Sequence, residues 1–169
     1  HVFQTQHQAG VATPFSFAAY GDSAYTPNVQ NFRGVQSRIN QLDPAFTLLL
    51  GDNVYNTGSH TESDARFNPL INPEAADWIA GHVDYYVAGN HDAATAGGQP
   101  SRDNFSVPIP EEDITAPATP PANVPTEHNY SFDYGNVHIA TIDSNFRHNV
   151  STLDTMLTWL EADMAASTA

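Results

Sequence analysis

The sequence predicts an α/β fold in which helices separate the short, buried strands of a parallel sheet. Three apolar runs, at 15–20, 46–50 and 85–88, end in Gly-Asp or Gly-Asn. The intervals between them contain segments typical of helices. Such alternation indicates a parallel sheet whose functional crevice lies beyond the carboxyl ends of its strands.

The first half of the chain is expected to run strand, helix, strand, helix, strand. After the strand FSFAAY at 15–20, apolar residues recur at helical spacing over 31–42. The run FTLLL at 46–50 is the second strand. A helix over 73–80 begins with proline, which is favoured in the first helical turn. The run YYVA at 85–88 is the third strand.

The second half predicts a long loop, a hairpin and a helix. Seven of the chain's 12 prolines fall within 93–126, a segment without periodicity that we interpret as a surface loop. The runs at 129–134 and 137–142 flank a Gly-Asn pair, the strongest hairpin signal in the chain. An apolar stripe over 151–166 predicts the final helix.

Composition excludes several classes of partner. The 169 residues include no lysine, and five arginines face 19 acidic residues, for a net charge of -14. Nucleic acids and anionic membranes require basic patches, so neither is an expected partner. Cysteine is absent, which excludes disulfides and thiolate metal sites. No apolar run approaches the roughly 20 residues needed to span a bilayer.

Three Asn-x-Ser sequons, at Asn104, Asn129 and Asn149, are candidate glycan acceptors. Glycosylation of such sequons occurs in exported proteins. We therefore expect a secreted or extracellular glycoprotein, with a vacuolar or lysosomal lumen as the alternative.

Metal-ligating side chains follow each of the three predicted strands. Asp22 follows the first, Asp52 the second, and Asn90 with His91 the third. A single Gly-Asp is usually a turn, but three such motifs in order at strand ends favour a metal site. A carboxylate such as Asp52 can bridge two metal ions about 3.5 to 4 Å apart, while Asp22 and Asn90 each serve one ion. His91 would contact a phosphate and protonate the leaving oxygen.

These motifs resemble those of the calcineurin-like metallophosphoesterases, and within them the purple acid phosphatases. Most of that superfamily has Asp-x-His in the first motif, whereas this chain has Asp22-Ser23-Ala24; Tyr55 follows Asp52 by three positions. This arrangement is similar to the acid phosphatase replacement of a histidine ligand by tyrosinate. The resemblance implies an α/β/β/α four-layer sandwich, of which we expect this sequence to contain only the first half.

The resemblance also implies a ligand set and a mechanism. Asp22, Asp52 and Tyr55 would hold a ferric ion, and Asp52 and Asn90 a divalent iron, zinc or manganese ion. A metal-bound hydroxide would attack phosphorus, with His91 assisting phosphate binding and departure of the leaving group. A phenolate ligand favours ferric iron.

The resemblance predicts two domain segments. Residues 1–14 would be the end of a preceding fibronectin-like domain and a linker, and 15–169 the amino-terminal half of the catalytic domain. The family's Val-x-x-His and Gly-His-x-His segments have no counterpart in this sequence. We expect further sequence or a partner chain to supply the missing half, and little turnover if the polypeptide truly ends at Ala169.

The function predicted from these observations is metal-dependent hydrolysis of phosphate monoesters, as in the purple acid phosphatases. Phosphodiesterase or pyrophosphatase activity on the same scaffold is one alternative. A non-catalytic secreted glycoprotein that keeps the phosphatase fold as a structural or binding module is the other. The substrate would be a phosphorylated small molecule or another phosphoester.

Overall fold

The computed structural model describes residues 6–23, 29–107, 129–145 and 150–169. The chain divides into two compact units, each described below by itself. The first contains Phe15–Phe105 and the second combines Thr5–Pro14 with Ser106–Ala169.

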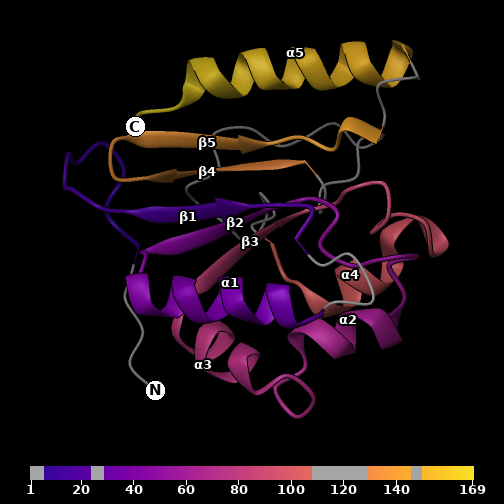
Figure 1. Ribbon diagram of the computed structural model, residues 1–169. Helices are drawn as coiled ribbons and strands as arrows, with labels where there is room; N and C mark the ends of the chain where they lie inside the picture. The colour runs from indigo at the N-terminus through magenta and orange to yellow at the C-terminus, as the bar shows by residue number, and fades with distance from the viewer. Residues whose placement is uncertain (1–5, 24–28, 108–128, 146–149) are drawn as a thin grey trace. The chain divides into compact units, whose positions relative to one another are not determined.

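The first unit is built on a parallel sheet in the order β1-β2-β3 (Figure 1). These strands are Phe17–Tyr20, Phe46–Leu50 and Val83–Val87. Both neighbouring pairs are parallel, with Tyr20 opposite Leu49 and Leu50 opposite Val87. All three strands therefore end at one edge of the sheet.

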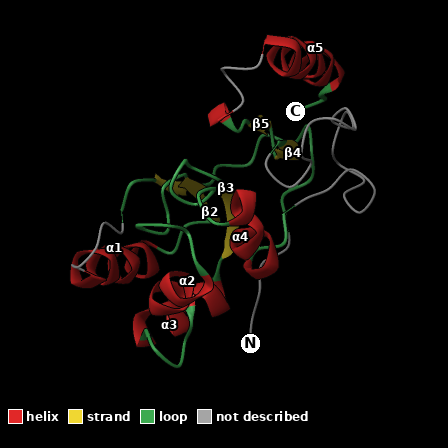
Figure 2. Cartoon of the chain, turned by 90° about the vertical axis from the view of Figure 1, so that its right-hand side faces the viewer, coloured by secondary structure: helices red, strands yellow, loops and turns green. Residues whose placement is uncertain are grey.

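Helices cover one face of this sheet. In chain order the helical elements of this unit are α1 (Val29–Leu42), α2 (His60–Phe67), α3 (Pro73–Gly81), the 3-10 turn η1 (Ala96–Gly98) and α4 (Gln99–Asn104). Figure 2 shows α1, α2 and α3 grouped on the same side of the strands, in agreement with Figure 1. The loops that follow β2 and β3 begin at the opposite end of these strands from their first residues, and several of their side chains, including Asn53, Val54 and Asp92, are buried.

Aromatic side chains fill the space between the sheet and its helices. Phe32 of α1 is fully buried and meets Phe67 edge to face, with ring centroids 5.5 Å apart. Phe67 in turn packs on Phe105, whose ring stacks on Tyr86 of β3 at 4.7 Å. Burying such rings supplies most of the free energy that holds a helix onto a sheet.

The second unit pairs the antiparallel strands β4 (Tyr130–Tyr134) and β5 (Val137–Thr141) and contains α5 (Val150–Ala166). Met156 and Trp159 of α5 form a small apolar core, against which Ile142, Leu153 and Leu160 pack.

A buried polar network fastens α5 to the hairpin. The ring nitrogens of His138 on β5 lie 2.6 Å from Asp133 of β4 and 2.8 Å from Asp163 of α5. The hydroxyl of Ser131 also donates to Asp163, at 2.7 Å. His138 therefore has a structural role in this unit.

The α/β class and the parallel sheet predicted from the sequence are confirmed. The hairpin and the helices expected over 31–42, 73–80 and 151–166 are present within two residues of the expected bounds. The third strand begins two residues earlier than expected, at Val83. Within the described residues, no helix is long and apolar enough to cross a membrane.

Three helical elements, α2, η1 and α4, were not predicted. The structureless loop expected over 93–126 is wrong for its first part, where η1 and α4 form, and 108–128 lies outside the described residues. Helix α2 was missed because it is short and polar. The proposed linker over 1–14 stays a prediction; in its described part, the backbone N–H of Gly10 donates to the carbonyl of Gly135 at 2.7 Å.

Candidate metal centre

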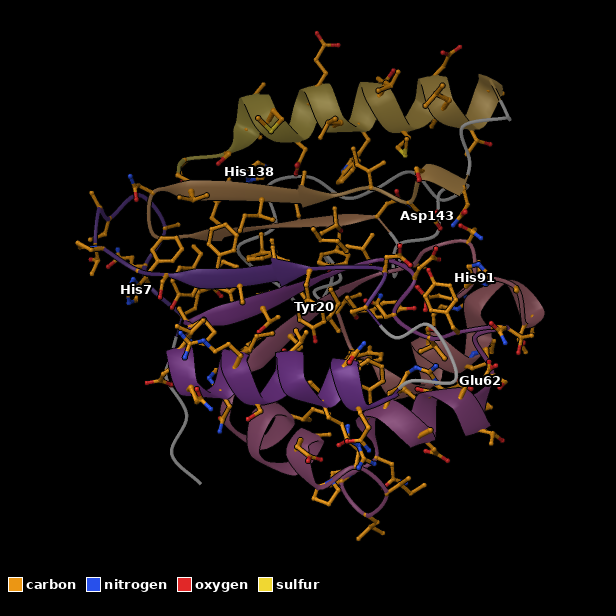
Figure 3. All side chains as sticks on the ribbon, viewed as in Figure 1. His7, Tyr20, Glu62, His91, His138 and Asp143 are labelled. Atoms are coloured by element: carbon orange, nitrogen blue, oxygen red, sulfur yellow. The ribbon has the colours of Figure 1, made fainter. Side chains whose placement is uncertain are left out.

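Three loops meet at the edge where β1, β2 and β3 end. The backbone N–H of Asp22, after β1, donates to the carbonyl of Gly51, after β2, at 3.0 Å. The backbone N–H of His91, after β3, donates to the carboxylate of Asp52 at 2.9 Å. Figure 3 shows His91 at this edge. The candidate residues that are distant in sequence are thus joined by direct hydrogen bonds.

The backbone at both aspartates is left-handed. Asp22 has φ of 52° and Asp52 φ of 48°, values that aspartate tolerates better than most residues. Gly89 lies so close to Asp52 that a Cβ atom at position 89 would overlap the backbone and carboxylate of Asp52. The Gly residues of the motifs therefore let the loops approach one another.

Tyr55 joins the first two motifs. Its hydroxyl donates to Oδ1 of Asp22 and lies 3.3 Å from Oδ2 of Asp52. The side chain is 5% exposed. Burial, the hydrogen bond to Asp22 and the neighbouring charge of Asp52 raise the pKa of Tyr55 above its ordinary value. A phenol, rather than a phenolate, is therefore the stable form of Tyr55 when only these groups surround it.

These donors suit a hard cation. The side chains of Asp22, Asp52 and Tyr55 bring carboxylate and phenol oxygens to one point, where the phenol proton of Tyr55 is donated to Asp22. A multivalent cation would replace that proton and neutralise the adjacent carboxylates. If tyrosine is not counted as a ligand, the described ranges contain no group of three or more His, Asp or Glu side chains able to hold a metal.

Asn90 and His91 occupy the third loop. Asn90 is exposed and lies between Gly89 and His91, whose backbones both contact Asp52. The ring of His91 packs on Tyr55, with centroids 4.4 Å apart, and its Nδ1 lies 2.7 Å from the carbonyl oxygen of Asn56. All five predicted site residues thus lie in loops that contact one another.

Sequence reasoning missed the role of Asp92. This side chain is fully buried and accepts hydrogen bonds from the backbone N–H groups of Asn53, Val54 and Gly89, at 2.8 to 3.1 Å. Burial raises the pKa of Asp92, while these donors oppose that shift. Asp92 therefore connects the second and third motif loops. Its place after Gly-Asn-His was the only sequence signal.

Replacing Asp92 with Ala is expected to lower the free energy of unfolding by about 3 to 5 kcal/mol, because three buried N–H groups lose their acceptor. Denaturant unfolding measures the change. Asp64→Ala, at an exposed position of α2, is the control and should stay within about 0.5 kcal/mol of the parent. Equal stabilities for the two variants would contradict this role for Asp92.

The sequons differ in accessibility. Asn104 is exposed, and its Nδ2 donates to Ser63 Oγ at 2.9 Å. Asn129 is fully buried and its Oδ1 accepts the backbone N–H of Asp143 at 2.9 Å, so the folded unit leaves no space for a glycan there. Asn149 lies outside the described residues.

A family model, calcineurin-like phosphoesterase, matches residues 15–167. The chain therefore belongs to the calcineurin-like phosphoesterase family. The recognition made from the three motifs is confirmed, and membership implies a dinuclear metal site.

Curated relatives are acid phosphatases. The chain is 30% identical over 95 residues to tartrate-resistant acid phosphatase type 5 of Rattus norvegicus, a match covering 51% of this chain and 29% of the relative. It is 34% identical over 85 residues to that of Sus scrofa, covering 45% and 25%. The match to that of Oryctolagus cuniculus is 35% over 91 residues, covering 48% and 28%. The chain thus matches less than a third of the length of each relative.

Proposed function

We propose that the protein hydrolyses phosphate monoesters at a two-metal site, as an acid phosphatase. The observation that carries the proposal is the convergence of the Tyr55 hydroxyl on the carboxylates of Asp22 and Asp52. Similarity to tartrate-resistant acid phosphatases supports the same reaction.

The proposed ligands divide between two ions. Asp22, Asp52 and Tyr55 would hold ferric iron, because a buried phenol beside two carboxylates loses its proton only to a strongly charged, hard cation. Asp52 and Asn90 would hold a divalent iron, zinc or manganese ion. The two ions would supply a water molecule of lowered pKa and would neutralise the phosphate oxygens.

The chain's own residues position the substrate and handle its proton. The Nδ1 atom of His91 faces the carbonyl of Asn56, so Nε2 is the ring nitrogen available to the substrate. In its doubly protonated form, His91 would donate the Nε2 proton to the departing oxygen while its Nδ1–H stays bonded to the carbonyl of Asn56. With a net charge of -14, the chain itself repels phosphate, which makes the metal charges necessary for substrate binding.

Two further proposals concern the remaining metal ligands and the location of the protein. Because Asp52 and Asn90 alone would give the divalent ion too few ligands, we propose that additional ones come from outside the described residues or from a partner chain. We also propose a secreted or extracellular location, supported by the exposed sequon at Asn104.

A substrate panel with metal removal tests this function. We expect the full-length protein to hydrolyse an aryl phosphate monoester at least tenfold faster than a phosphodiester or pyrophosphate, which is about 1.4 kcal/mol of preference. Chelation should abolish turnover, and iron with zinc or manganese should restore it. Faster diester or pyrophosphate cleavage would favour the alternative activities. Absence of turnover on the whole panel, with metals bound, would favour the non-catalytic scaffold.

A further inference from the structure

Glu62 of α2 holds the loop of residues 56–59, which connects the second motif to that helix. Its Oε1 accepts the backbone N–H of Asn56 at 2.5 Å. Its Oε2 accepts the backbone N–H groups of Thr57 and Ser59, at 3.0 and 3.1 Å, and both their hydroxyls. Although burial opposes ionisation, these bonds lower the pKa of Glu62 to about 2. The carboxylate of Glu62 therefore fixes three of the backbone N–H groups of this loop.

The same loop contacts His91. Its ring Nδ1 lies 2.7 Å from the carbonyl oxygen of Asn56. A carbonyl only accepts hydrogen bonds, so Nδ1 carries a proton, and Nε2 is the atom that faces the substrate and carries the second proton when His91 acts as an acid. Gly58 lies directly against the backbone carbonyls of His91 and Asp92, with no space for a Cβ atom. The loop thus touches both the ring and the backbone of His91.

We propose that Glu62 is a positioning residue for His91: by holding Asn56, it keeps the Nδ1–H of His91 bonded to the carbonyl of Asn56 and so sets the ring orientation that presents Nε2 to the leaving group. This proposal rests on the proposed function of His91 in phosphate ester hydrolysis. Glu62 touches neither the substrate nor the metal ligands, and acts through one backbone carbonyl. Figure 3 shows Glu62 and His91 at the same end of the first unit.

Capping of α2 does not account for all of these contacts. Ser59 and Glu62 form a capping box, in which each side chain bonds the backbone of the other. A capping box requires Glu62 to reach only Ser59, yet Glu62 also bonds Thr57 and Asn56, outside the helix. The carbonyl of Thr57 accepts a further bond from the hydroxyl of Thr95, at 2.6 Å, which holds the loop from the other side.

Glu62→Gln separates the two roles. The amide oxygen of Gln can still accept the N–H of Ser59, but its amide nitrogen would face the N–H of Asn56, donor against donor. We expect α2 to remain folded while the carbonyl of Asn56 loses its fixed orientation. In ¹⁵N-histidine-labelled full-length protein freed of iron, the parent should show His91 protonated at Nδ1, and Glu62→Gln a mixture of tautomers.

Turnover of the metal-loaded, full-length protein is the second measurement. We expect Glu62→Gln to lower kcat about 10- to 100-fold, the scale of a misplaced catalytic group, with KM changing less than about threefold. In a His91→Ala background, Glu62→Gln should lower kcat no further, because Glu62 acts only through His91. If Glu62→Gln lowers kcat by the same factor in the parent and in His91→Ala, the proposal is wrong.

Two matched variants complete the test. Asp64→Asn removes the same charge from an exposed position of α2 and should leave the His91 tautomer and kcat unchanged. Ser59→Ala removes the helix cap but keeps the bond to Asn56, and should lower stability without altering His91. If Ser59→Ala changes the ring signals as much as Glu62→Gln, helix integrity is responsible and the proposal is wrong.

Glu62→Asp guards against misfolding of the Gln variant. It keeps the charge but is one methylene shorter, so it cannot reach both Ser59 and Asn56, and it should produce the same mixture of tautomers. Unchanged His91 signals in a folded Gln or Asp variant would overturn the proposal. The tautomer measurement does not depend on turnover. If the protein hydrolyses none of the substrates, the proposed function is refuted, and the tautomer measurement still shows whether Glu62 positions His91.

Discussion

Asp52→Asn is expected to remove most bound metal and to lower kcat/KM by about 10³-fold or more, since losing metal catalysis costs several kcal/mol and each 1.36 kcal/mol is tenfold. The amide oxygen of Asn can still accept the N–H of His91, a bond that is 2.9 Å long in the parent. The fold should therefore survive. Metal and activity are lost because a neutral amide cannot replace the negatively charged carboxylate that would bridge the two cations. Metal analysis and steady-state kinetics measure both effects.

Asp43→Asn is the matched control. Asp43 follows α1, has φ of 48° like Asp52, and its carboxylate lies 3.5 Å from His82, with the side chain 83% exposed. The substitution thus makes the same chemical change on the same backbone conformation, outside the motif loops. Its metal content and kinetics should match the parent. An Asp52→Asn variant that keeps its metal and its rate would remove Asp52 from the site.

His91→Ala is expected to lower kcat about 10²- to 10⁴-fold, the usual loss when a general acid is deleted, and to leave the metal content unchanged. The loss is confined to chemistry because only the backbone N–H of His91, which Ala retains, bonds Asp52. For an aryl phosphate whose phenol has a low pKa, kcat should fall less than for an alkyl phosphate, because that leaving group departs without being protonated.

His60→Ala is the control for this substitution. His60 opens α2, pairs with Asp103 at 3.3 Å and is 60% exposed. Removing it deletes a solvent-exposed contact of small energetic value and should leave kcat unaltered. An unchanged kcat in His91→Ala would exclude His91 from the mechanism. If the variant loses its bound metal as well as its activity, His91 has a structural role instead.

Strand ends were the most predictable part of the fold. Each buried run ends in Gly-Asp or Gly-Asn, and parallel pairing brings these ends to one edge, so the positions of Asp22, Asp52 and Asn90 follow from alternation alone. Helix α2 was harder because its residues are mostly polar and no apolar stripe marks it. The Ser59 and Glu62 capping-box spacing was the available signal.

The connections among the loops were not predictable. Asp92 and Glu62 act by accepting backbone N–H groups, and spacing along the chain does not reveal which N–H groups a distant carboxylate will meet. Asn129 shows the reverse case, because its sequon predicts exposure while the fold buries the side chain. Short motifs specify residue type, whereas tertiary packing decides accessibility and partners.

The most direct test of the two-metal site is the metal content and visible absorption of the purified full-length protein, compared with Tyr55→Phe. We predict about two metal ions per chain, one of them ferric, and a tyrosinate charge-transfer band. The band should vanish in Tyr55→Phe while the circular dichroism stays the same, because Phe retains the ring that packs on His91. A colourless, metal-free parent, or a band that persists in Tyr55→Phe, would contradict the proposed centre.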